Sequence, residues 1–164
     1  MSKSENTNKK EGSTLCEDFV QIAKDAIAKY PDLQHSWTIN ADNACCSLMF
    51  QKQKEDGFDV LVEVTTTGIT VSTHGAHQHF DSSEDSNESK IKDALALVRD
   101  LLSPNMRIKE LCAGKSAYRW DMEYLDNNQW CLENSTLIFW NYFGKRNERI
   151  LQNSTLPGRL TTAN

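Results

Sequence analysis

Residues 58–73, FDVLVEVTTTGITVST, decide the fold because apolar and polar side chains alternate along them. Every second position at the start of this stretch is apolar: Phe58, Val60, Val62 and Val64. Successive side chains of a strand point to opposite faces, so Asp59 and Glu63 are expected on the solvent side. Gly68 interrupts the pattern and Ile69 begins another strand. The stretch therefore predicts an antiparallel sheet with one buried and one exposed face.

The same period of two recurs on both sides of this stretch. Further strands are predicted over residues 36–39, 45–53, 106–112, 118–124 and 130–132, with a final strand ending near residue 152. Asp56-Gly57 is a strong signal for a two-residue hairpin, and residues 126–128 (Asp-Asn-Asn) predict another turn. Residues 136–143 (TLIFWNYF) are apolar at nearly every position, which predicts a central strand covered on both faces.

Two helices are predicted from apolar residues at spacings of three and four. The first begins at Thr14, whose hydroxyl and the Glu17 carboxylate can form a capping box, and it ends before Pro31. The apolar stripe of the second helix extends from Ile91 to Leu102, and the helix ends at Ser103-Pro104.

The start of the second helix lies in an acidic, serine-rich stretch, residues 81–89 (DSSEDSNES). Asp85 is the expected N-cap and Glu88 its partner three residues on. Acidic side chains at this position also suit the helix dipole.

Together these elements predict an α+β fold in which two helices pack on antiparallel meander sheets, in the order helix, strands, helix, strands. Residues 14–152 form the predicted single domain. Residues 1–13 and 153–164 are polar and poor in apolar side chains, so both are expected to be disordered tails.

Composition favours a cytoplasmic, soluble protein. The chain of 164 residues has the length of one domain, and its 38% hydrophobic content is too high for a disordered protein. It contains neither a run of about 18 apolar residues nor an N-terminal hydrophobic segment, so neither membrane insertion nor secretion is expected. The five cysteines are scattered without a Cys-x-x-Cys motif, which favours reduced thiols in the cytosol.

The net charge of −5 is unevenly distributed. No Lys or Arg occurs between Lys54 and Lys90, whereas that stretch contains Glu55, Asp56, Asp59, Glu63, Asp81, Glu84, Asp85 and Glu88. Residues 107–119 carry the opposite charge, from Arg107, Lys109, Lys115 and Arg119. Such a field attracts basic partners to the acidic side. The densest basic cluster, near Arg146 and Arg149, is too small on an acidic protein to predict nucleic-acid binding.

Three histidines, His74, His77 and His79, occur within six residues at the end of a predicted strand. Because residues two apart on a strand share a face, His77 and His79 could chelate a metal together. Asp81 or His35 could complete a zinc or iron site, although the familiar metal-binding spacings are not present. A metal-binding protein or metal-dependent enzyme is therefore the alternative hypothesis, and an exposed histidine-rich loop without a metal is the simpler interpretation.

In size, charge and α+β build, the chain is similar to small acidic bacterial adaptors such as toxin-neutralising immunity proteins and type III secretion chaperones. The secretion chaperones end in a helix, whereas this chain is predicted to end in strands. The resemblance implies a non-enzymatic protein that acts by binding another protein. No cofactor and no catalytic residues are expected. The leading hypothesis is an acidic face within residues 55–88 that binds a basic protein, and homodimer formation stays open. The residues expected to make that contact are Asp59, Glu63, Asp81, Glu84, Asp85 and Glu88.

Overall fold

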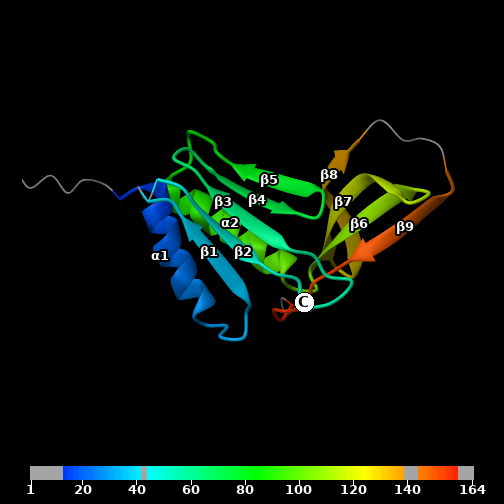
Figure 1. Ribbon diagram of the computed structural model, residues 1–164, viewed down its shortest axis with the longest axis horizontal. Coiled ribbons are helices and arrows are strands. Elements are labelled where there is room, and N and C mark those ends of the chain that lie inside the picture. Colours follow the sequence, from blue (N-terminus) through cyan, green and yellow to red (C-terminus); the bar gives the residue numbers. More distant parts are fainter. Residues whose placement is uncertain (1–12, 42–43, 139–143, 159–164) are drawn as a thin grey trace, which may run out of the picture.

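The computed structural model describes residues 13–41, 44–138 and 144–158 (Figure 1). The two helices are α1 (Leu15–Ile27) and α2 (Asn87–Leu101). The strands that follow α1 are β1 (His35–Ile39), β2 (Cys46–Phe50), β3 (Val60–Val64), β4 (Ile69–Thr73) and β5 (Ala76–Phe80). Those that follow α2 are β6 (Met106–Ala113), β7 (Ser116–Asp126), β8 (Gln129–Leu137) and β9 (Arg146–Leu151). The order and the antiparallel sheets confirm the predicted α+β class.

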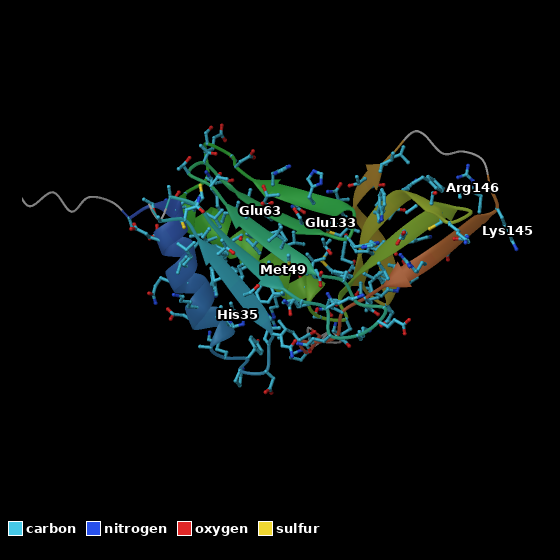
Figure 2. All side chains as sticks on the ribbon, in the orientation of Figure 1. His35, Met49, Glu63, Glu133, Lys145 and Arg146 are labelled. Carbon is cyan, nitrogen blue, oxygen red and sulfur yellow. The ribbon has the colours of Figure 1, made fainter. Side chains whose placement is uncertain are left out.

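Strands β1 to β5 form the first sheet, an antiparallel meander in which each strand pairs with the next. Leu48, Val62 and Val71 lie side by side on its inner face and are completely buried. Both helices contribute to the same hydrophobic core. Met49 and Glu63, labelled in Figure 2, belong to the opposite face, where side chains are exposed or half-buried. The alternation predicted for residues 58–64 is confirmed.

Helix α1 begins with the predicted capping box. The Thr14 backbone N–H donates to the Glu17 carboxylate at 2.9 Å, and the Glu17 N–H donates to the Thr14 hydroxyl at 3.2 Å. These two bonds satisfy amides that the first turn of a helix leaves without partners. On the apolar face of α1, Phe19 is fully buried and its ring meets the edge of Trp37 from β1.

Helix α2 is capped by Ser86 and not by Asp85, so the predicted N-cap is wrong. The Ser86 backbone is extended, and its hydroxyl accepts a hydrogen bond from the Ser89 N–H at 3.1 Å. The helix starts one residue later than the cap prediction requires, which puts Glu88 in the first turn. There its charge still favours the positive end of the helix dipole.

Strands β6 to β9 form the second sheet, in the order β8-β7-β6-β9. Asn127 and Asn128 connect β7 to β8 with positive φ angles of 46° and 62°, as a two-residue hairpin turn requires. The prediction of a central strand over residues 136–143 is wrong for its first two residues, 136 and 137, which belong to an edge strand. Strand β8 ends at Leu137 and lies at the edge of the sheet, and residues 139–143 are outside the described part of the chain.

The predicted two-residue hairpin at Asp56-Gly57 is also absent. Strands β2 and β3 do pair, but residues 51–59 connect them as a longer loop. Near the end of this loop, the backbone of Phe58 is hydrogen-bonded to the side chain of Asn153. Asn153 and Leu156 are buried, with 2% and 6% exposure, although the sequence placed both in the C-terminal tail. The packed structure thus continues past residue 152.

Candidate functional site

The two sheets meet at the turn between β4 and β5. Gly75 in this turn has a φ of 76°, and a Cβ at this position would overlap the indole ring of Trp120 on β7. A few residues further, the Asn134 side chain on β8 donates to the backbone carbonyl of His77 at 2.9 Å. The hairpin of β4 and β5 therefore contacts the second sheet, and residues 76–80 form strand β5 where the sequence predicted a loop. His74, His77 and His79 are nevertheless exposed.

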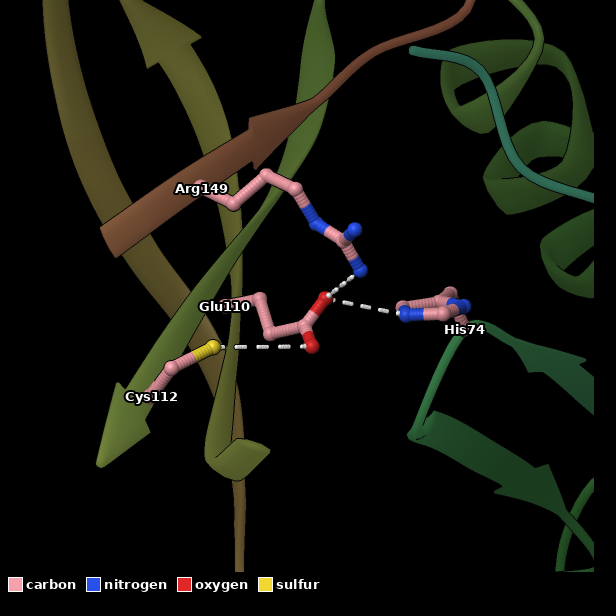
Figure 3. A network of polar contacts seen from close by, with 4 residues as sticks. All are labelled: His74, Glu110, Cys112 and Arg149. Carbon is pink, nitrogen blue, oxygen red and sulfur yellow. Dashed lines mark hydrogen bonds and ion pairs between the residues drawn. The ribbon is translucent and has the colours of Figure 1, made fainter. Parts of the chain in front are cut away.

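A polar network centred on Glu110 lies at this junction (Figure 3). Glu110, on β6, is 4% exposed. Its Oε2 lies 2.7 Å from a guanidinium nitrogen of Arg149 on β9 and 3.0 Å from Nε2 of His74 in the turn between β4 and β5. The Glu110–Arg149 pair joins neighbouring strands of the second sheet, and the Glu110–His74 contact joins that sheet to the first.

The network keeps Glu110 ionised. Burial by itself would raise the pKa of the Glu110 carboxyl, but the hydrogen bonds and charges of Arg149 and His74 outweigh burial and lower this pKa. The same carboxylate raises the pKa of the Arg149 guanidinium. Each partner thus favours the charged form of the other, as expected for a buried charge that is retained because it is paired.

Cys112 is the fourth member of the network, with its Sγ 3.8 Å from the other carboxylate oxygen, Oε1 of Glu110. Burial, together with the nearby negative charge of Glu110, raises the pKa of the Cys112 thiol. Nucleophilic cysteines need the thiolate form and a neighbouring base or cation. Although the charge of Arg149 acts in the other direction, the net effect on Cys112 is a raised pKa that disfavours the thiolate. The arrangement therefore fits a structural junction better than a catalytic site.

Part of this network was visible in the sequence. The alternation along residues 106–112 placed Glu110 on the same side as Met106 and Ile108, both now found buried. A glutamate among apolar residues of one strand face signals a buried carboxylate that must be paired. Its partners could not be read, because His74 and Arg149 are 36 and 39 residues away along the chain.

Two further carboxylates of the second sheet are less exposed than their positions in the sequence pattern indicate. Asp121 and Glu123 on β7 belong to the strand's polar positions, and such side chains are usually solvated. Asp121 is nevertheless only 5% exposed and accepts 2.6 Å hydrogen bonds from Arg119 and Ser135. Glu123 pairs with Arg107 at 2.6 Å.

The structure does not bring the three predicted histidines together. His77 and His79 share the outer face of β5, with ring centroids 5.0 Å apart, and His79 Nδ1 lies 2.9 Å from the Thr70 hydroxyl. His74 instead faces Glu110 on the second sheet. Within residues 13–41, 44–138 and 144–158, no group of three or more His, Cys, Asp or Glu side chains is arranged to hold a metal ion. This geometry gives the metal-site hypothesis no support.

All six predicted partner-contact residues are exposed, and five of them gather at one end of the first sheet. We call these five the acidic end: Glu63, Asp81, Glu84, Asp85 and Glu88. Asp81 follows β5 and packs on Gly68, where an added Cβ would lie 2.7 Å from the Asp81 Cβ. Glu63 on β3 is two strands from β5. It lies level with His79 through Thr70, and two strand spacings place Glu63 about 10 Å from His79.

Asp59 does not belong to the acidic end. It precedes β3, whereas Glu63 lies near the end of that strand, about 13 Å further along. Its carboxylate accepts a 2.8 Å hydrogen bond from the Lys52 backbone N–H. The cluster of predicted contact residues in the structure is therefore smaller than the acidic face predicted within residues 55–88.

Exposed basic residues lie at the far end of the molecule. Lys115, Lys145 and Arg146 come together beside the turn between β6 and β7, where the Gly114 N–H donates to the Lys145 carbonyl at 2.9 Å. The Arg146 guanidinium stacks 4.6 Å above the ring of Tyr118. Figure 2 shows Lys145 and Arg146 at the outer end of the second sheet, and Glu63 on the first sheet, away from them. The charge asymmetry of the sequence is thus a separation in space.

Comparison with known proteins adds no further guide. The chain matches no protein-family model, and no curated protein or solved structure is significantly similar to it. In the described part of the chain, neither helix is long and apolar enough to cross a membrane. The functional argument therefore depends on the geometry alone.

Proposed function

We propose that this protein is a non-enzymatic protein-binding module that docks a basic partner protein through its acidic end. The partner is defined by its chemistry, a surface of clustered Lys or Arg side chains. This is the adaptor or immunity-type function expected from the sequence, with the contact surface narrowed from six predicted residues to five.

The observation that carries the proposal is that the carboxylates of the acidic end form no ion pair within the described part of the chain. No Lys, Arg or His nitrogen among the described residues lies within 4.0 Å of any carboxylate of the acidic end. Lys90, the nearest base in sequence, is buried and donates to the Thr67 carbonyl at 3.2 Å. In the second sheet, by contrast, Glu110, Asp121 and Glu123 all have cationic partners. Unpaired, exposed charges are free to contact a partner.

The chemistry of the remaining buried groups favours binding over catalysis. Glu110 has both carboxylate oxygens occupied, and the pKa of the Cys112 thiol is raised by burial. A general base or a nucleophile needs an unoccupied reactive atom beside a cavity. These contacts support a structural role for the junction.

The test is a binding comparison between two variants with the same change in net charge. One neutralises four of the five carboxylates of the acidic end, with Asp81→Asn, Glu84→Gln, Asp85→Asn and Glu88→Gln. The control replaces four exposed acids elsewhere, with Asp25→Asn, Asp32→Asn, Asp93→Asn and Glu133→Gln. Partners are captured from a lysate of the source organism with the wild-type protein and identified by mass spectrometry. Association rates of the recovered partner are then measured against ionic strength.

We expect the acidic-end variant to associate at least about tenfold more slowly at low salt and to show a flatter salt dependence, because the steering charges are gone. The control variant should keep most of the wild-type rate. Equal rates and equal salt dependence for all three proteins would refute the proposal. Retention of the fold is checked by circular dichroism.

A further inference from the structure

A groove of about 310 Å³ opens between α1 and α2 on the side of the molecule away from the exposed sheet face. The helices are in contact and diverge toward their C-terminal ends (Figure 1). The groove floor is formed by buried apolar side chains of the core: Leu33, Phe50, Val98, Leu102 and Leu156. Its volume is at the lower end of the range of about 300–1,000 Å³ that small-molecule sites occupy.

The charged residues that line the groove are all basic. Lys29 follows α1, and Lys92 and Arg99 lie on α2. No carboxylate in the described part of the chain lies within 4.0 Å of these three cations. Arg99 is in the last turn of α2, where a cation also offsets the helix dipole, but Lys92 is earlier in the helix and has no such role.

An apolar groove bordered only by cations is unexpected in a chain with a net charge of −5. Its floor offers burial to an alkyl chain, which the hydrophobic effect favours. Its border offers attraction to an anionic head group. We infer that this groove binds an anionic amphiphile, a long-chain carboxylate or a molecule of the same chemistry.

The dimensions favour a small ligand over a protein segment. The α2 border from Lys92 to Leu102 is about 15 Å long, which suits an extended alkyl chain of medium length. An α-helix with its side chains is about 10–12 Å wide, so a partner helix cannot enter a groove of about 310 Å³ and would insert only single side chains. Tyr30, which also lines the groove, adds a polar hydroxyl group.

The experiment is isothermal titration of the full-length protein with three probes. Dodecanoate, below its micelle concentration, carries the proposed chain and charge. Dodecyltrimethylammonium has the same chain with a cationic head, and butanoate has the same head with a short chain. We expect one dodecanoate to bind per protein, the cationic probe to bind at least about tenfold more weakly, and butanoate to give no heat of binding.

Variants then locate the binding site. Lys92→Glu with Arg99→Glu should weaken dodecanoate binding at least about tenfold. The matched control, Lys24→Glu with Lys115→Glu, makes the same charge change at exposed positions outside the groove and should leave binding unchanged. Ala96→Trp, at an exposed position of the lining, should block binding by filling the groove.

Three results would overturn the inference. The first is absence of dodecanoate binding at millimolar concentration, and the second is equal affinity for the two twelve-carbon probes. The third is equal loss of binding in the groove variant and its control. None of these readouts involves the acidic end, so failure here is distinguishable from failure of the proposed protein-binding function.

Discussion

His74 and Glu110 connect the two sheets through a single contact of 3.0 Å between Nε2 and Oε2. His74 is partly exposed, at 43% of its side chain, whereas the side chain of Glu110 is only 6% exposed. The carboxylate is thus shielded from water on a strand of one sheet while the imidazole reaches it from a turn of the other. The relative position of the sheets depends on groups that are far apart in sequence.

Glu110→Gln should destabilise the protein by about 1–3 kcal/mol at neutral pH, because Arg149 and His74 lose a charged acceptor. The pKa of the Glu110 carboxyl is lowered from 4.5, so the unfolded chain takes up this proton first as the pH falls. Its stabilisation is therefore present above pH 4.5 and is lost as the pH falls through the folded-state pKa. Urea unfolding from about pH 7 to about pH 3 should show a smaller loss of stability in the variant than in the wild type.

The control for this prediction is Glu133→Gln, at an exposed residue with no ion pair among the described residues. Its pH profile should follow that of the wild type. If the stability of Glu110→Gln fell with pH in parallel with that of the wild type across the whole range, Arg149 and His74 would not lower the pKa of Glu110.

Gly75→Ala should destabilise the protein by at least about 3 kcal/mol, from a left-handed backbone and overlap with Trp120. Gly114→Ala provides the matched control, because Gly114 also has a positive φ, 63°, but an added Cβ would meet no atom within 4 Å. The control should lose only about 1–2 kcal/mol of stability, the cost of a left-handed backbone conformation for a residue with a Cβ. Thermal and urea unfolding measure both. Equal losses would mean that the turn between β4 and β5 does not pack on Trp120.

Asn153→Ala should lower the free energy of unfolding by about 3 kcal/mol, because buried backbone groups lose their partners. The Asn153 side chain accepts from the Phe58 N–H at 3.2 Å and donates to the Phe58 and Leu101 carbonyls at 3.0 Å and 3.1 Å. Ser154→Ala, at the exposed neighbour, should have almost no effect. Urea unfolding of the two variants tests whether this segment is part of the fold. If both behave as the wild type, the sequence-based assignment to a tail is restored.

Ser86→Ala should cost about 1 kcal/mol through loss of the N-cap of α2. Asp85→Ala removes the residue that the sequence indicated as the cap and should cost less, since its side chain accepts no capping bond in the described structure. The two midpoints of thermal unfolding decide between the candidates. A larger effect of Asp85→Ala would reverse the assignment.

Local patterns in the sequence determined the secondary structure. The capping box of Thr14 and Glu17 spans three residues, and the alternation of residues 58–64 depends only on the geometry of one strand. The turn at Asn127-Asn128 likewise follows from side chains that tolerate a positive φ. Such features are set by contacts between near neighbours, so the α+β class could be read before any tertiary structure was known.

Only the tertiary structure decided which polar groups are buried and which remain available. Asp59 and Glu63 have the same place in the alternation as Asp121, yet Asp121 is buried among partners from its own and a neighbouring strand. Asn153 reaches Phe58 across 95 residues. Whether a polar side chain is buried and paired depends on which elements the topology brings together. That arrangement is set by many long-range packing contacts. The sequence by itself therefore determined the elements and the charge asymmetry, whereas the fold decided the Glu110 junction, the extent of the acidic end and the basic-rimmed groove.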